Sequence, residues 1–300
     1  MAMTYFHSGE ADAPVLDGQA GSLVALLDAV LVNGYSSGAT ERQPLGWEIA
    51  FSDTDRRAYR MSGGSQRILY VDDTAQGAAN DEAALVRGYD DMTGIDAGTG
   101  PFPDGENKFF IKRENGSGES DWVVVGSDSF IYFASKFDQD SVFGYEVHGF
   151  GDLEIEPYMD GVVVTALFGF GRNDPAWPEG CIFGDEAEPW MYPRADGTAQ
   201  SASGSMIAMN DTLNAQDSAF SSSPTRGLSL MFVPIFVRRG GEYSGKVPDC
   251  LYSIIRTADS QNMVKEVTNV AGHEGERFLF INTCIDSGPT NTTTAYRLES

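Results

Sequence analysis

The chain has 300 residues, 41% of them hydrophobic and 11% aromatic, which is enough for a real core and excludes global disorder. It carries 44 acidic and 20 basic residues, a formal net charge of −24. Because a surface this acidic repels phosphate, sequence-specific nucleic-acid binding is not expected. The acidity fits solubility in a salty medium, and an acidic channel through which nucleic acid slides is the alternative.

The first elements predicted along the chain are an extended arm and one amphipathic helix. Residues 1–19 predict the arm. In Gly21–Asn33, leucine and valine recur at helical spacing and form a single apolar stripe, with Ser22 as the expected N-cap and Gly34 as the left-handed stop. We expect this helix to cover the sheet that follows, or to dock on a neighbouring subunit.

An antiparallel meander is predicted next, because four short apolar segments are separated by residues that close turns. The four segments are 47–52, 57–61, 67–72 and 82–89. Residues 93–103 then predict a long Gly/Pro loop, which suits an assembly contact better than a catalytic lid.

The remaining strands are predicted from short apolar runs, and Pro234 marks one of them as an edge strand or a bulged strand. These runs are 107–112, 121–127 and 129–135 (a hairpin), 142–148, 161–168, 228–239, 250–256, 277–282 and 294–298, with 206–209 undecided. The fold class expected is mainly β, with antiparallel sandwich or barrel-like sheets, one N-terminal helix and long loops. The domains expected are the arm 1–19, a helix plus β-rich domain over 20–170, and a loop-rich β domain over 171–300, with a soft boundary near 170.

Catalytic chemistry is not predicted from the scarce residue types. The histidines are His7 in the arm, His148 in a predicted strand and His273 in a turn, and neither GxSxG nor a phosphate-binding glycine motif accompanies them. We interpret His148 as a partly buried strand residue whose ring is satisfied. No catalytic, cofactor-binding or metal-binding residue is assigned.

Carboxylates are the one abundant functional group. Asp152, Glu154 and Glu156 alternate on one strand face, which could bind a cation or a sugar hydroxyl but is more typical of a solvated face. The calcium candidates are Asp53-Thr54-Asp55, Asp72-Asp73 and Asp138-Gln139-Asp140, and none of them completes the twelve-residue EF-hand pattern.

Aromatic residues are dense between residues 130 and 160, which fits either a carbohydrate platform or, as we favour, core and inter-subunit contacts of a sandwich. They are Tyr132, Phe133, Phe143, Tyr145, Phe150 and Tyr158. Trp177 and Trp190, further along the chain, would carry the carbohydrate alternative.

The cysteines Cys181, Cys250 and Cys284 are odd in number and have no CxxC spacing, so they predict buried free thiols rather than disulfides or a zinc site. The N-terminal residues lack a basic region followed by a long apolar run, which predicts no secretory signal. No window approaches the ~20 apolar residues of a membrane helix. Synthesis in the cytosol without membrane insertion is therefore expected.

Several segments carry a resemblance to a known family. They are APVLDGQAGSLVALLDAVLVNGY, GWEIAFSDTDRRAYR, RILYVDDT, VRGYDDMTGIDAGTGPFP, WVVVGSDSFIYFASKF and GYEVHGFGDLEIEP. Over about residues 10–160 they resemble a family of virion structural proteins of tailed bacteriophages. The chain departs from that family in its acidity and in the stretch 170–225.

The resemblance implies a structural, non-enzymatic subunit of a tailed-phage virion, in the tail, baseplate or neck. Its partners would be copies of itself and other virion proteins, held in symmetric contacts to which the arm and the loop 93–103 contribute. A capsid decoration protein, or a carbohydrate-binding receptor module of the tail, is the alternative. A calcium-stabilised domain is a weaker one.

Overall fold

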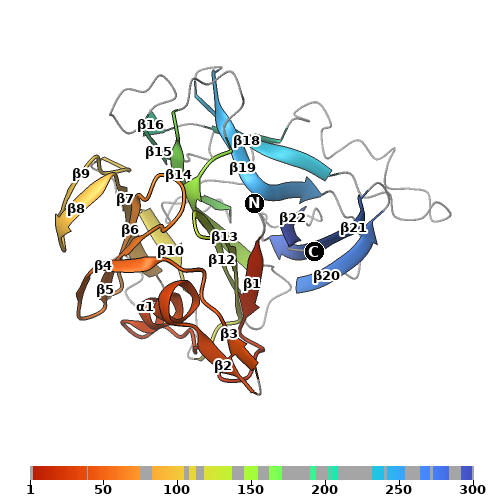
Figure 1. The fold of residues 1–300 in the computed structure, drawn as a ribbon, viewed down its shortest axis with the longest axis horizontal. Coiled ribbons are helices and arrows are strands. Elements are labelled where there is room, and N and C mark those ends of the chain that lie inside the picture. The colour runs from red at the N-terminus through yellow and green to blue at the C-terminus, as the bar shows by residue number, and fades with distance from the viewer. Residues whose placement is uncertain are drawn as a thin grey trace.

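The structure is a computed structural model, and it confirms a mainly β fold built from antiparallel sheets with one short helix (Figure 1). In the residues that it describes, the strands do not close into a barrel. The described residues are 3–38, 40–74, 83–104, 108–112, 118–136, 145–154, 162–170, 190–193, 202–203, 205–208, 232–239, 242–253, 264–270, 273–283 and 292–298.

The strands form one large sheet, one five-stranded sheet and two separate hairpins. The large sheet contains β1 (Thr4–His7), β11 (Trp122–Gly126), β12 (Phe130–Lys136), β13 (Tyr145–Asp152), β14 (Thr165–Phe170), β15 (Trp190–Tyr192), β16 (Ala202–Ser203), β17 (Ser205–Ala208), β18 (Phe232–Arg239), β19 (Glu242–Ser253), β20 (Val264–Val270), β21 (His273–Thr283) and β22 (Thr292–Leu298). The five-stranded sheet has the order β10 (Lys108–Ile111), β7 (Ala83–Tyr89), β6 (Ile68–Asp72), β5 (Arg56–Arg60) and β4 (Glu48–Asp53). The hairpins are β2 (Tyr35–Ser37) with β3 (Thr40–Arg42), and β8 (Asp91–Gly94) with β9 (Ala97–Thr99).

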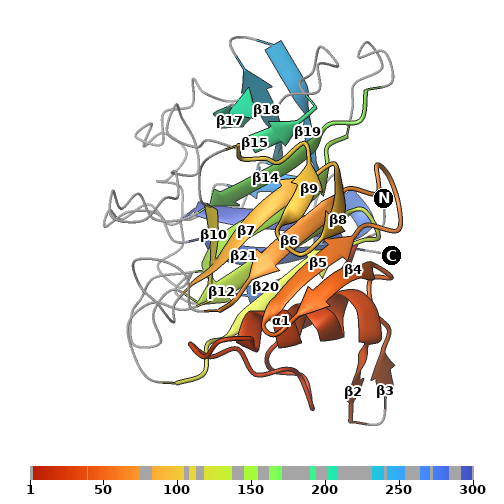
Figure 2. The same cartoon turned by 90° about the vertical axis from the view of Figure 1, so that its left-hand side faces the viewer.

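The central strands β11, β12 and β13 are buried on both faces, which explains why their sequences are continuous apolar runs. On β11, Val124 points to a core shared with the helix and the five-stranded sheet. Its neighbours Val123 and Val125 point to a second core, shared with the C-terminal strands. Because successive side chains of a strand alternate between faces, one layer of strands supports both cores. Figure 2 shows the five-stranded sheet in front of these central strands.

The predicted helix is present, but its ends are held differently from the prediction. It comprises α1 (Ser22–Leu27) and a π-helical continuation, η1 (Asp28–Asn33), and it packs its leucines into the core of its own chain rather than on another subunit. Ser22 is not the cap, because its hydroxyl donates to the Asp17 carbonyl. Gly34 does end the helix, with a φ of 72°. A Cβ there would lie 2.5 Å from the Arg42 carbonyl oxygen, so only glycine fits.

The N-terminal segment is not the separate arm that was predicted. Strand β1 pairs with β11 over its whole length, and Phe6 and Leu16 are buried in the chain's own core. The predicted boundary near residue 170 does not interrupt the large sheet either, since β13 pairs with β14 on one side and β21 on the other. Residues on both sides of that boundary share one core.

The prediction of a loop over residues 93–103 is wrong for the first part of that segment, where β8 and β9 form a hairpin. Asp96 occupies its turn with a φ of 61°, a conformation that aspartate tolerates better than most residues. Strand β18 is bulged as Pro234 indicated, with register shifts between Pro234 and Phe236 and between Val237 and Arg238. It is not an edge strand, because it lies between β17 and β19.

Candidate functional site

His148 is a buried structural residue, as the sequence indicated, and its ring is sealed from solvent. Its Nε2 accepts a hydrogen bond of 3.0 Å from the Ile111 amide, and the ring stacks on Phe110 with centroids 5.0 Å apart. Burial lowers the pKa of His148 to about 3, so the imidazole is neutral in the folded protein. A neutral ring in such an enclosed place joins β13 to β10 and has no access to a substrate.

Two members of the predicted carboxylate triplet, Asp152 and Glu154, are bound to other residues and do not form the solvated face that the sequence favours. Asp152 accepts hydrogen bonds from the Ser65 amide (2.5 Å) and hydroxyl (2.7 Å) and from the Thr165 hydroxyl (2.5 Å). Glu154 forms an ion pair with Lys246. Glu156 lies outside the described residues. Asp152 therefore ties the turn before β6 to the large sheet.

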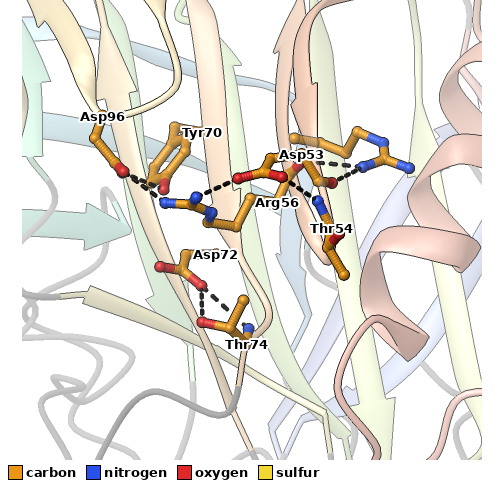
Figure 3. Close-up of polar contacts among 8 residues, drawn as sticks. Asp53, Thr54, Arg56, Tyr70, Asp72, Thr74 and Asp96 are labelled. Carbon is orange, nitrogen blue, oxygen red and sulfur yellow. Dashed lines mark hydrogen bonds and ion pairs between the residues drawn. The ribbon is translucent and has the colours of Figure 1, made fainter.

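Among the calcium candidates on the five-stranded sheet, Asp53 pairs with arginine and Asp72 accepts hydrogen bonds from Thr74 (Figure 3). Arg56 forms ion pairs with Asp53 and, at 2.5 Å, with Asp96. The Thr54 amide and Arg56 hold the pKa of Asp53 below its ordinary value. In the part of the chain that is described, no group of three or more potential ligand side chains could hold a metal ion. The third candidate, Asp138-Gln139-Asp140, lies outside the described residues.

The β8–β9 hairpin is held on the outer face of the five-stranded sheet by three such pairs. Besides Arg56 with Asp96, Arg60 pairs with Asp91 at 2.7 Å and Arg67 with Asp90 at 3.0 Å. The Tyr70 hydroxyl donates to Asp96 at 2.5 Å, and burial followed by this hydrogen bond raises the Tyr70 pKa. Beneath the hairpin lies a small apolar cluster that includes Ile68, Tyr70 and Met92. The first part of the segment 93–103, which was predicted to contact neighbouring subunits, is thus bound to the five-stranded sheet of its own chain.

A buried ion pair, which the sequence analysis missed, holds the helix N-terminus. Lys112 Nζ lies 2.7 Å from Asp73 Oδ1, and both side chains are 0% exposed. Asp73 Oδ2 accepts from the Leu23 amide at 2.9 Å, and Lys112 also donates to the Gln19 carbonyl at 2.8 Å. Burial raises the pKa of Asp73, and the Lys112 ammonium opposes that shift. The feature of the sequence that could have indicated this ion pair is the lysine at the end of the apolar run 109–111.

A surface groove of about 360 Å³ lies where β1 and β11 face β20 and β21. Its walls include Tyr5, His7, Asp121, Tyr145 and Glu266. The Tyr5 hydroxyl donates to Glu266 across the gap at 3.1 Å, and the two residues are 261 positions apart in the chain. Figure 1 shows β1 beside the C-terminal strands at this place. The groove exists only because the two ends of the chain meet there.

The polar groups of the groove have defined partners and charges. Glu266 pairs with Arg277 at 2.7 Å, and this hydrogen bond lowers the pKa of the carboxyl. Asp121 accepts from the Ser8 hydroxyl at 3.3 Å and faces Lys136 at 3.8 Å. Burial and the nearby Asp121 carboxylate raise the pKa of Tyr145. The other predicted histidine, His273, pairs with Glu276 at 3.1 Å away from this groove.

Four of the six aromatic residues predicted between residues 130 and 160 are described, and all four are buried in the core. Tyr132, Phe133 and Phe150 are fully buried, whereas Tyr145 also lines the groove. Phe143, Tyr158 and Trp177 lie outside the described residues, and of Trp190 only the backbone is described, within β15. Cys250 is a buried free thiol, as expected, and Cys181 and Cys284 lie outside the described residues.

The fold and the groove together define a β-sandwich protein with a polar surface site. No helix among the described residues has the length and apolarity to cross a membrane. No model of a known protein family matches the chain, and no curated protein matches it.

Proposed function

We propose that the chain is a structural, non-enzymatic subunit of a tailed-phage virion, located in the tail, baseplate or neck. It assembles through symmetric contacts with copies of itself and with other virion proteins. The observation that carries the proposal is that the segments that resemble the virion family pack against one another around a shared core. They supply α1, the five-stranded sheet, the β8–β9 hairpin and the central strands β11–β13.

The charged residues of those segments support the proposal because they join elements that are distant in sequence. Asp73 holds the start of α1 and pairs with Lys112, and Asp152 holds the turn at Ser65. Asp96 holds its hairpin on Arg56. A structural subunit needs such hydrogen bonds and ion pairs between distant elements to keep its shape in a particle. A carboxylate that is held in such an interaction is not available for acid–base chemistry.

Two exposed features suit contacts between subunits. Strand β4 ends the five-stranded sheet in the described part of the chain, and a sheet edge offers unpaired amides and carbonyls to a neighbour. The β2–β3 hairpin extends from the body of the protein (Figure 2). Its base is fixed by Arg42, which pairs with Glu10 at 3.1 Å and lies 4.8 Å above the Phe6 ring. The base of the hairpin is therefore fixed to the body of the protein while its strands extend away from it.

Mass spectrometry of purified particles from a phage that encodes this chain tests the proposal. We expect the chain among the virion proteins, in a small copy number set by tail symmetry. Its absence from purified particles refutes the proposal. Imaging of particles labelled on this chain separates tail, baseplate or neck from the alternative of capsid decoration, which would place label over the whole shell.

A second measurement tests the contacts themselves. Native mass spectrometry of the purified protein is expected to show a symmetric oligomer. Replacing Thr40 and Glu41 by proline removes strand pairing in the β2–β3 hairpin and should shift the population towards monomer. An unchanged oligomer in that variant would place the contact elsewhere and reject the role of the hairpin.

A further inference from the structure

The groove between β1–β11 and β20–β21 has the size and construction of a small-ligand site. Its volume of about 360 Å³ falls in the range of roughly 300–1,000 Å³ that is usual for such sites. Two pairs of strands from the large sheet, β1 with β11 and β20 with β21, supply its walls, and the Tyr5–Glu266 hydrogen bond fixes their separation. Walls on strands are held more rigidly than loops, so the groove is largely formed before any ligand arrives.

One wall carries two neighbouring aromatic rings. Tyr5 and His7 lie two residues apart on β1, so their side chains share a face. Their ring centroids are 5.9 Å apart and their planes differ by 16°. The His7 side chain is 40% exposed, so this surface can be reached from solvent. An exposed aromatic ring can pack against the apolar face of a ligand.

The groove is polar but its charges are compensated. Arg277 balances Glu266, and Lys136 lies near Asp121. An anion would meet two carboxylates, and a cation would have to compete with the arginine and lysine already present. Carboxylates that are held by cations still accept hydrogen bonds from hydroxyl groups. This balance favours a neutral ligand that donates many hydrogen bonds.

Tyr145 adds a tyrosine side chain to the lining of the groove. Its side chain lines the groove and is only 7% exposed. The Asp121 carboxylate is close enough to act on its hydroxyl electrostatically. A tyrosine hydroxyl both donates and accepts hydrogen bonds, so Tyr145 can offer a polar group to a ligand in the groove.

We propose that this groove binds a neutral saccharide, a mono- or disaccharide unit of a glycan. The sugar ring lies on the Tyr5–His7 surface, its hydroxyls donate to Asp121 and Glu266, and the Tyr145 hydroxyl donates to a sugar oxygen. The residues that carry this proposal are other than the tryptophans that the sequence suggested for carbohydrate binding. The proposal does not depend on a place in a virion, because binding is a property of the isolated chain.

Saturation-transfer NMR with the purified protein tests the site, using maltose, lactose and N,N′-diacetylchitobiose as neutral probes. We expect saturation transfer to at least one of them. We expect Tyr145→Phe, which removes only the hydroxyl, to weaken that binding about tenfold or more, equivalent to the loss of one good hydrogen bond. His7→Ala, at an exposed position, should weaken it through loss of the ring surface.

The control is Tyr70→Phe, which removes a tyrosine hydroxyl that binds Asp96 and does not line the groove, and which should leave saccharide binding unchanged. Saturation transfer to none of the three sugars overturns the proposal, as does equal binding by wild type and Tyr145→Phe. Preferential binding of tetramethylammonium or inorganic phosphate also overturns it, since either result would show that the groove is not charge-balanced. None of these results bears on whether the chain is found in purified particles.

Discussion

Acid titration of His148 gives the most quantitative test of the structure. Its pKa lies at about 3 in the folded protein, against 6.5 for an ordinary histidine, because burial disfavours the charged ring. Between those two values the unfolded chain binds a proton that the folded chain does not bind. The contribution of the neutral ring to stability is therefore complete above pH 6.5 and is lost as the pH falls towards 3.

The slope expected from this one group is about 1.4 kcal/mol per pH unit, and the whole shift corresponds to about 5 kcal/mol. Urea unfolding of wild type and His148→Gln at a series of pH values between 3 and 7 measures it. Glutamine does not titrate and keeps an oxygen that can accept from the Ile111 amide. We expect the stability difference between the two proteins to change by several kcal/mol across this range, with the wild type losing more towards acid.

The matched control is His7→Gln, because His7 is an exposed histidine whose side chain is 40% accessible. This variant replaces a histidine outside the buried core, so it controls for the substitution itself. Parallel curves for wild type and His148→Gln would refute the reasoning, because they would mean that burial of His148 does not suppress its protonation.

Two further predictions concern stability at neutral pH and are measured by urea unfolding. Lys112→Met leaves the buried Asp73 carboxylate without its cation and should lower the free energy of unfolding by about 3–5 kcal/mol. Asp91→Asn breaks an exposed ion pair and should lower it by less than about 1 kcal/mol. Equal losses for the two variants would refute the argument from burial. Gly64→Ala should cost about 1–3 kcal/mol, because φ is +60° and a Cβ would lie 2.1 Å from Asp152 Oδ2. Gly94→Ala, with open space at its Cβ, should change stability little, and a cost as large as that of Gly64→Ala would contradict this account.

Local pattern was sufficient to locate much of the secondary structure. The apolar stripe over Gly21–Asn33 predicted the helix, and the turn at Gly34 predicted its end. The runs WVVVG and FIYFAS predicted β11 and β12 because a strand buried on both faces is continuously apolar. Where polar residues dominate, as at β8 and β9, the pattern suggested a loop, since a short exposed hairpin buries too little to leave an apolar signature.

The polar ties were not predictable, because each joins residues that sequence spacing does not relate. Asp73 was read as a calcium candidate, whereas Lys112 neutralises it and Leu23 donates to it. Asp152 was read as part of a solvated face, whereas Ser65 and Thr165 bind it. A carboxylate's role depends on which strands lie beside it, and strand order is set by the competition of long-range pairings rather than by local periodicity.

The sequence by itself therefore determined the class of fold, the helix, most strand positions and the large acidic excess. Only the tertiary structure decided that β1 belongs to the same sheet as the C-terminal strands, and that Tyr5 meets Glu266 to form a groove. The physical reason is that alternation along a strand fixes which side chains share a face, but not which other strand faces them. Which strands face one another is decided by the burial of both faces of the central strands, and this burial brings the two ends of the chain together.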